Sequence, residues 1–153
     1  MRKASAAVFF IALLASALAL GAALAHALEL PNKMALSQQD YFTVQKIYSG
    51  WDRLGFLLVV QLIAICAVIF VHRRERLVLG ASLAALAGLI MAQAIFWWFT
   101  FPANQATQNW TLQPDNWEQL RSQWEYSHLA GALFQMLALS ALIIAVLGRS
   151  AKD

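Results

Sequence analysis

Two pairs of histidine and glutamate occur at the same spacing in distant parts of the chain. His26 precedes Glu29 by three residues, and Glu125 precedes His128 by three, in the reverse order. Side chains three residues apart lie on one face of a helix. If the two segments are antiparallel neighbouring helices, histidine lies opposite histidine and glutamate opposite glutamate. Four side chains that bind metals or transfer protons would then converge.

These four side chains suit two kinds of chemistry. Two imidazoles and two carboxylates can hold a transition metal ion, and the ligand types alone do not choose among Fe, Cu, Zn and Mn. Di-iron bundles also use Glu-x-x-His pairs but need two further glutamates, so the metal set His26, Glu29, Glu125 and His128 fits one ion better. Without a metal, the same groups can accept protons. A structural role is the alternative, since Arg121 lies four residues before Glu125 and can pair with it.

The sequence contains four long runs without charged residues, and we expect these runs to form the helices that position the histidines and glutamates. Crossing a bilayer takes roughly 20 apolar residues, and within lipid a helix satisfies its own backbone hydrogen bonds. Of the 153 residues, 61% are hydrophobic and 12% charged, which excludes a disordered chain and an ordinary soluble domain. We expect an all-α integral membrane four-helix bundle in one domain, residues 1–153. The expected spans are residues 4–28, 54–71, 77–101 and 127–148.

The first run has a second interpretation. Residues 1–3 carry two basic side chains, and residues 25–27 are mostly small, as in a secretory signal peptide. The apolar stretch between them is longer than the usual core of about 7–15 residues in such a signal. We therefore expect this run to be retained as a membrane span.

Positive charges indicate the orientation in the membrane. The short segment 72–76 between the second and third runs contains three arginines, and the basic residues of both chain ends lie on the same side. The positive-inside rule makes this side cytoplasmic, so both termini are expected inside and the His/Glu residues outside. The expected location is a bacterial cytoplasmic membrane. The net charge of +3 thus reflects orientation, and no stripe of basic and aromatic residues suits a nucleic acid.

Two long outer segments, residues 29–53 and 102–126, connect the spans. Each begins near a proline, Pro31 or Pro102, which we expect to end the preceding helix because proline lacks the N–H of a helical hydrogen bond. We expect short helices within both segments.

Local signals place these short helices. Ser37 and Asp40 fit a helix start, and Gly50 suits a helix end. Pro114 is well placed at a second helix start. The pattern from Trp117 onward indicates a helix that runs directly into the fourth span.

All six tryptophans lie at or near the outer boundary. Trp117 and Trp124 share a helix face, so they either belong to an interfacial aromatic belt or line a pocket that binds a flat cofactor or substrate. We expect them to cover the His/Glu site together with residues 41–48. The tryptophans that a belt explains best are Trp97, Trp98 and Trp110.

The second half of the chain resembles a known family. Pro102-Ala103-Asn104, followed by Trp117-x-x-Leu120-Arg121-x-x-Trp124-Glu125-x-x-His128, is similar to the anthrone oxygenase-like family of small four-helix membrane proteins, most of unknown function. Residues 25–33 resemble a bacterial branch of it. The resemblance implies oxidation of anthrones to anthraquinones by molecular oxygen without an obvious organic cofactor. Its polar signature would be Asn104, Arg121, Trp124, Glu125 and His128.

Two classes of function follow from these patterns. The first is a membrane-embedded oxidoreductase or oxygenase acting on a lipid-soluble aromatic or quinone-like molecule at the outer interface. His128 and Glu125 would be its base or metal ligands, while Arg121 and Asn104 would orient a substrate oxygen or stabilise negative charge. The alternative is a non-catalytic accessory or scaffold subunit of a homo-oligomer or larger membrane complex, in which the His/Glu cluster is structural.

Overall fold

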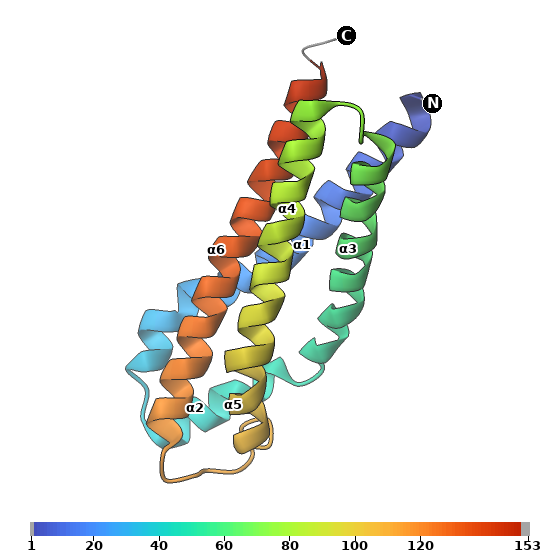
Figure 1. Ribbon diagram of the computed structural model, residues 1–153. Helices are drawn as coiled ribbons and strands as arrows, with labels where there is room; N and C mark the ends of the chain where they lie inside the picture. Colours follow the sequence, from blue (N-terminus) through green and yellow to red (C-terminus); the bar gives the residue numbers. More distant parts are fainter. Residues whose placement is uncertain (1, 151–153) are drawn as a thin grey trace.

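The computed structural model describes residues 2–150, with side chains from 4 to 149, and this part of the chain contains helices and no strand. Four long helical segments lie side by side (Figure 1), and each is long and apolar enough to cross a membrane. The predicted all-α four-helix bundle is confirmed. The long helices are α1 (Arg2–Met34), α3 (Leu54–Val71), α4 (Arg76–Ile95) and α6 (Trp117–Ser150).

The outer surface of the bundle fits a lipid bilayer. Large apolar side chains such as Phe56, Phe70 and Leu147 are 79%, 69% and 65% exposed. An apolar surface of this extent is unfavourable in water and stable against acyl chains. The lipid environment predicted from composition therefore agrees with the structure.

In residues 2–150, the short helices lie at the same end of the bundle, in or next to the two longer connections between the long helices (Figure 1). Both termini and the turn between α3 and α4 lie at one end, and the longer connections lie at the other (Figure 1). This arrangement is the one that four spans require. That the end with the termini is cytoplasmic stays a prediction from charge. The short elements are α2 (Gln38–Gln45), the 3₁₀ helices η1 (Lys46–Tyr48) and η2 (Trp51–Arg53), the π-helix η3 (Phe96–Thr100) and α5 (Phe101–Ala106).

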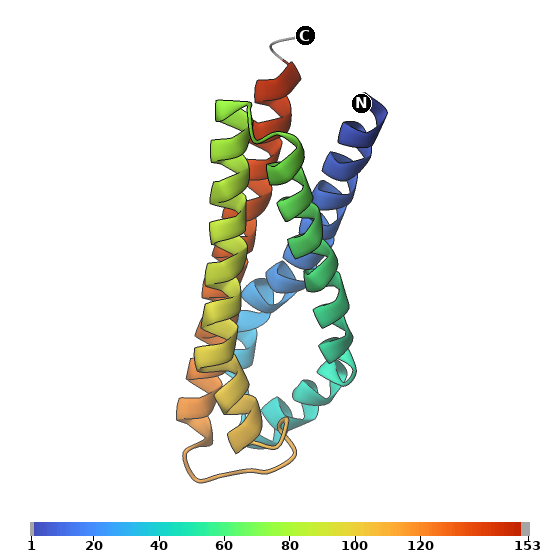
Figure 2. The same cartoon turned by 45° about the vertical axis from the view of Figure 1, so that its right-hand side comes forward.

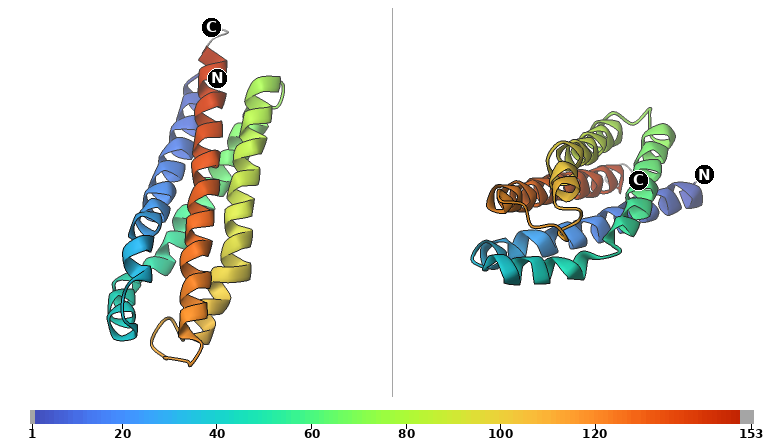
Figure 3. Two further views of the ribbon diagram at one scale, coloured as in Figure 1. Left: turned by 90° about the vertical axis from the view of Figure 1, so that its left-hand side faces the viewer. Right: turned by 90° about the horizontal axis from the view of Figure 1, so that it is seen from below.

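Helix α6 lies between α1 and α4 (Figure 3) and packs along both. Helices α1 and α3 pack together near the terminal end and separate toward the other end, where α2 and the two 3₁₀ helices bridge them (Figure 2). The α1–α6 contact positions the candidate site, because these two helices carry the two His/Glu pairs.

The prediction that Pro31 ends the first helix is wrong. Pro31 lies inside α1, which continues to Met34. The proline removes only its own N–H bond, and few residues follow it in the helix. The last turn is stabilised instead by Lys33, which pairs with Glu29 one turn earlier at 3.4 Å. As a result α1 extends beyond the expected boundary at residue 28.

The prediction that Pro102 ends the third helix is also wrong. The helical chain widens into η3, where the N–H of Phe101 donates to the carbonyl of Phe96, five residues back. A π-type turn makes room for the proline ring, and Pro102 then occupies the first turn of α5, where no N–H is needed. The third span therefore extends over Arg76–Ala106.

Three other local predictions are confirmed. The Ser37 hydroxyl accepts from the Asp40 N–H at 3.2 Å and caps α2, and Gly50 adopts a left-handed φ of 85° after η1. Helix α6 begins at Trp117 and runs unbroken into the fourth span. Pro114 lies just before this helix, and its carbonyl accepts from the Trp117 N–H at 3.1 Å.

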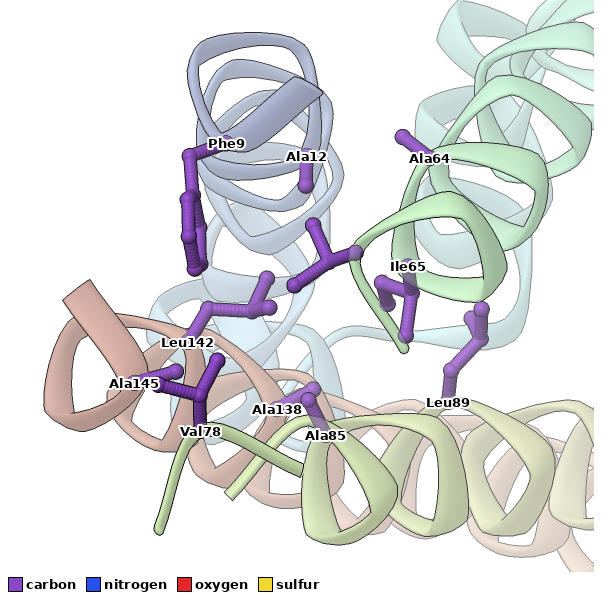
Figure 4. Close-up of a cluster of buried hydrophobic side chains, with 11 residues drawn as sticks. Phe9, Ala12, Ala64, Ile65, Val78, Ala85, Leu89, Ala138, Leu142 and Ala145 are labelled. Atoms are coloured by element: carbon purple, nitrogen blue, oxygen red, sulfur yellow. The ribbon is translucent and has the colours of Figure 1, made fainter. Parts of the chain in front are cut away.

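The apolar core fills the half of the bundle nearer the termini. Small and branched side chains from all four long helices meet there, including Ala12, Ile65, Leu89 and Leu142 (Figure 4). Gly88 allows close approach of α4 to α6, because a Cβ there would lie 2.9 Å from the Phe134 carbonyl oxygen. This core anchors α1 against α6 and so fixes the relative position of their outer ends.

Candidate functional site

The imidazole rings of His26 and His128 stack on each other at the α1–α6 contact. Their centroids are 4.2 Å apart with an interplanar angle of 39°. His26 is buried at 6% exposure, and His128 is half-buried. The mirrored spacing predicted that the two histidines meet, and the structure brings them together.

A hydrogen bond fixes the tautomer of His128. Its Nδ1 lies 2.8 Å from the carbonyl oxygen of Trp124. A carbonyl only accepts, so Nδ1 carries the proton, and in a neutral ring Nε2 keeps its lone pair. Nε2 of His128 is therefore free to accept a hydrogen bond or a proton in the neutral ring.

Aromatic rings surround His26 on its other sides. The rings of Tyr48, Trp51 and Trp124 lie 4.6, 5.3 and 5.1 Å from the His26 ring, centroid to centroid. The Nδ1 atom of His26 is buried and has no hydrogen-bond partner. Trp124 contacts both histidines, its ring lying 3.9 Å from that of His128. The pair therefore sits in an aromatic enclosure, to which Trp124 and Tyr48 contribute as expected and Trp51 contributes in addition.

A buried lysine joins the two predicted carboxylates. Lys33 is 3% exposed, and its Nζ lies 3.1 Å from Glu125 Oε1 and 3.4 Å from Glu29 Oε2. It also donates to the Tyr48 hydroxyl at 2.9 Å, and it lies 4.9 Å from the ring centroids of Tyr48 and Trp124. The two glutamates therefore converge, as the spacing predicted, but around a cation of the chain itself.

Glu125 is the most deeply buried charged residue of the site. Its side chain is 1% exposed, and Oε1 accepts from the Tyr41 hydroxyl at 2.9 Å as well as from Lys33. A buried charge is costly unless it is paired and hydrogen-bonded. Its second oxygen, Oε2, has no partner, so part of its accepting capacity is unused.

Two tyrosines from the first outer segment complete the network. Tyr48 donates to Glu29, and Tyr41 donates to Glu125. Burial, followed by the negative charge of Glu125, raises the pKa of the Tyr41 phenol. Burial, followed by the hydrogen bond to Glu29, raises the pKa of the Tyr48 phenol. Both phenols stay protonated at physiological pH and act as donors.

Asn104 holds two indole rings in place. Its Oδ1 accepts from Trp124 Nε1 at 2.8 Å and from Trp110 Nε1 at 3.2 Å. The predicted role of Asn104 toward a substrate oxygen stays a prediction, since in this structure the amide oxygen is occupied by these two donors.

The assignment of Trp110 to an exposed belt is wrong. Trp110 is 5% exposed and packs on Tyr41 and Phe42. It lies in a run of three left-handed residues, beginning at Gln108, with φ of 48°, 54° and 63°. The Thr107 hydroxyl accepts from the Trp110 N–H at 3.1 Å and stabilises this turn. Trp97 and Trp98 are 56% and 72% exposed, as a belt requires.

Arg121 connects the fourth span to the first outer segment. Its guanidinium donates to the Leu36 carbonyl at 3.0 Å and lies 4.5 Å from the Trp117 ring centroid. The Tyr41 ring centroid is 5.6 Å away. Trp117 and Arg121 thus cover the Tyr41 side of the site, and no ion pair joins Arg121 to Glu125 in the part of the chain that the structure describes.

Unpaired polar atoms gather around this network. Both amide atoms of Gln45 are buried without partners, and so are Glu125 Oε2, His26 Nδ1 and Arg121 Nε. Buried polar atoms in folded proteins nearly always have partners. The site therefore has donors and acceptors in excess of those that the packing uses.

Among the residues described, 2–150, no three His, Cys, Asp or Glu side chains are arranged to hold a metal ion. The carboxylates that the sequence assigned to a metal contact Lys33 and the tyrosines. The metal set His26, Glu29, Glu125 and His128 stays a prediction without support from this geometry.

An open groove of about 330 Å³ lies between α1 and the start of α3, where these helices separate. Trp51 lines this groove and also contacts the His26 ring. A volume near 300 Å³ is at the lower end for small-molecule sites. Its other lining residues are Ala22, Gly50, Arg53, Leu54 and Leu57.

Lys33 is a central residue of the site that the sequence did not predict. Lys33 follows Glu29 by four residues, a spacing that predicts an ion pair on one helix face. This pair was not predicted because Pro31, between the two residues, was expected to end the helix. Gln45 has no comparable signal, since a glutamine on a short polar helix is most often exposed.

No protein family, curated protein or solved structure matches this chain. The resemblance to the anthrone oxygenase-like family therefore stays a prediction from the residues that carry it.

Proposed function

We propose that the protein is a membrane-embedded oxidoreductase that acts on a lipid-soluble aromatic molecule of the anthrone or hydroquinone type. The observation that supports this most is the stacked His26–His128 pair, enclosed by aromatic rings and adjoining a buried lysine. The pair offers a base, the rings offer a flat apolar surface, and the lysine offers a positive charge.

The chemistry assigned to the residues is removal of a proton. His128 Nε2 accepts the proton from an acidic C–H or O–H of the substrate, and its tautomer is held by the Trp124 carbonyl. The Lys33 ammonium stabilises the resulting aromatic anion, which then reduces molecular oxygen. For an anthrone, one O₂ converts the CH₂ group to a carbonyl and yields one water, so atoms and electrons balance.

The groove beside Trp51 provides a path for such a substrate. A lipid-soluble molecule enters laterally where α1 and α3 separate and reaches the aromatic enclosure of His26. Arg53, at the rim of the groove, is suited to bind an electronegative oxygen of the substrate.

Binding of anthrone and anthraquinone to the protein in nanodiscs tests the substrate class. Leu57→Trp, which fills the groove, should weaken binding about tenfold or more relative to wild type. Leu62→Trp is the matched control, because Leu62 lies on the same helix and is 41% exposed outside the groove. Empty nanodiscs correct for partition into lipid. If both variants bind these compounds as tightly as wild type, the groove is not the binding site.

A scaffold role is the second candidate, and one observation favours it. Lys33, Glu125 and Tyr41 tie α1, α6 and α2 together through buried contacts. If the network is purely structural, replacing its members should destabilise the fold, and the wild-type protein should show no small-molecule activity.

A further inference from the structure

At the opposite end of the bundle, one residue of α1 and two residues of the turn between α3 and α4 form a continuous hydrogen-bonded line. The Ser5 hydroxyl oxygen lies 2.7 Å from His72 Nε2, and His72 Nδ1 lies 2.7 Å from Glu75 Oε1. Ser5 belongs to α1, His72 follows α3, and Glu75 precedes α4. Ser5 and His72 are buried at 5% and 4% exposure, and the Phe9 ring packs on His72 at 5.0 Å.

The order of these contacts sets the proton positions. The Glu75 carboxylate only accepts, so His72 Nδ1 carries a proton and Nε2 of the neutral ring keeps its lone pair. That lone pair faces the Ser5 hydroxyl, which must donate to it. This is the arrangement in which histidine raises the nucleophilicity of a serine and a carboxylate orients the histidine.

We propose that Ser5, His72 and Glu75 form a nucleophilic triad that cleaves a fatty-acyl ester or thioester whose leaving group bears phosphate. The site lies at the end of the bundle with the basic residues, where ester groups of membrane-bound acyl chains lie. Arg74 and Arg76, on either side of Glu75, are exposed and suited to bind phosphate. The exposed side chain of Phe70 offers an apolar surface for the acyl chain.

The reaction needs no oxidant or cofactor. Ser5 Oγ bonds to the acyl carbon while its proton passes to His72 Nε2. The bond from the acyl carbon to the leaving oxygen or sulfur then breaks, and the leaving group takes that proton. Water, activated by the same nitrogen, releases the fatty acid and restores Ser5.

The start of α4 supplies candidate donors for the negative oxygen formed in this step. Glu75 is the N-cap residue of α4, yet its side chain does not cap the helix and faces His72 instead. Among the side chains that the structure describes, 4–149, none caps the first N–H groups of this 20-residue helix next to the triad. Backbone N–H groups at a helix start favour an anion.

Covalent labelling tests the triad directly. The full-length protein in nanodiscs is treated with diisopropyl fluorophosphate, a reagent small enough for a buried serine, and the adduct is located by mass spectrometry. We expect labelling at Ser5 in wild type, none in Ser5→Ala, and at least about a hundredfold slower labelling in His72→Gln. Ser140→Ala, an exposed serine of α6, is the matched control and should label like wild type. Absence of a Ser5 adduct in folded wild type, or equal rates in wild type and His72→Gln, would overturn the proposal.

Fatty-acid release identifies the substrate within the proposed class. Release in phosphatidylglycerol nanodiscs without additions assigns the reaction to lipid esters, and release only after addition of palmitoyl-coenzyme A assigns it to thioesters. In both cases Ser5→Ala should abolish release. Labelling of Ser5 without release from either compound would overturn the phosphate-bearing acyl substrate. Unchanged melting temperatures of the variants show that the fold is retained.

Discussion

Lys33 of α1 and Glu125 of α6 form a buried ion pair of 3.1 Å beside the stacked histidines. Neither side chain exceeds 3% exposure. Each residue neutralises the charge of the other, and the pair joins α1 to α6, the two helices that carry the histidines. We therefore expect this pair to stabilise the half of the bundle that holds the site and to set the charge that the proposed substrate anion meets.

Removing one member of this pair should destabilise the protein strongly. Lys33→Met leaves Glu125 buried without its cation, and such a loss costs about 3–5 kcal/mol. The double variant Lys33→Met/Glu125→Gln should recover much of this, because no uncompensated charge is left. Unfolding in mixed detergent micelles measures the free energies. Additive losses in the double variant would show that the two residues do not interact.

Alkaline pH should weaken the contribution of the tyrosines. The pKa values of Tyr41 and Tyr48 are raised in the folded protein, so their stabilisation is complete below the unfolded value of about 10. Above this pH the unfolded state loses protons that the folded state keeps, and stability falls.

The Tyr41→Phe/Tyr48→Phe variant isolates this effect. The difference in unfolding free energy between wild type and this variant should be constant from pH 8 to 9 and shrink above about pH 10. Chemical denaturation over this pH range provides the measurement. A difference that grows with pH would contradict the raised pKa values.

The orientation of the bundle can be tested with single cysteines. In a Cys66→Ser background, Ser37→Cys should react with an impermeant maleimide from outside intact cells, and Glu75→Cys should react only after lysis. The reason is that three arginines at residues 72–76 favour the cytoplasmic side. Reaction of Glu75→Cys in intact cells would reverse the topology.

The helical period explains what could be predicted from sequence. The spacing of His26 and His128 from their glutamates determines their faces on α1 and α6, and four spans make these helices antiparallel. The two rings meet because α1 and α6 are also neighbours, which the sequence left as a condition and the structure supplies. The capping of α2 by Ser37 follows equally from local hydrogen bonding.

Tertiary context explains what was missed. Pro31 removes one backbone hydrogen bond, but the helix continues because Lys33 pairs with Glu29 on the same helix and contacts Glu125 and Tyr48 on other segments. Trp110 is buried because residues 108–110 form a left-handed turn, and this turn contains no glycine that would have predicted it. The bonds of Asn104 also depend on the fold, because its side-chain oxygen accepts from the indoles of Trp110 and Trp124, six and twenty residues further along the chain.

Two glutamates of α6, one buried and one exposed, allow a matched test of whether the buried charge takes part in the reaction. Glu125→Gln removes a buried charge that pairs with Lys33, whereas Glu118→Gln alters an exposed residue two turns earlier. We expect anthrone oxidation to fall at least about tenfold in the first variant and to be unchanged in the second. Equal rates in the two variants would mean that the Lys33–Glu125 pair has no part in the reaction.

Oxygen uptake by the purified protein with anthrone tests the proposed oxidoreductase most directly. In nanodiscs, wild type should consume one O₂ per anthraquinone formed, faster than nanodiscs alone. His128→Ala should lower the rate at least about a hundredfold, the usual loss when a general base is removed, while keeping the melting temperature within a few degrees. Uptake by His128→Ala at the wild-type rate, or no uptake by wild type above the background, would contradict the assignment of His128 as the base.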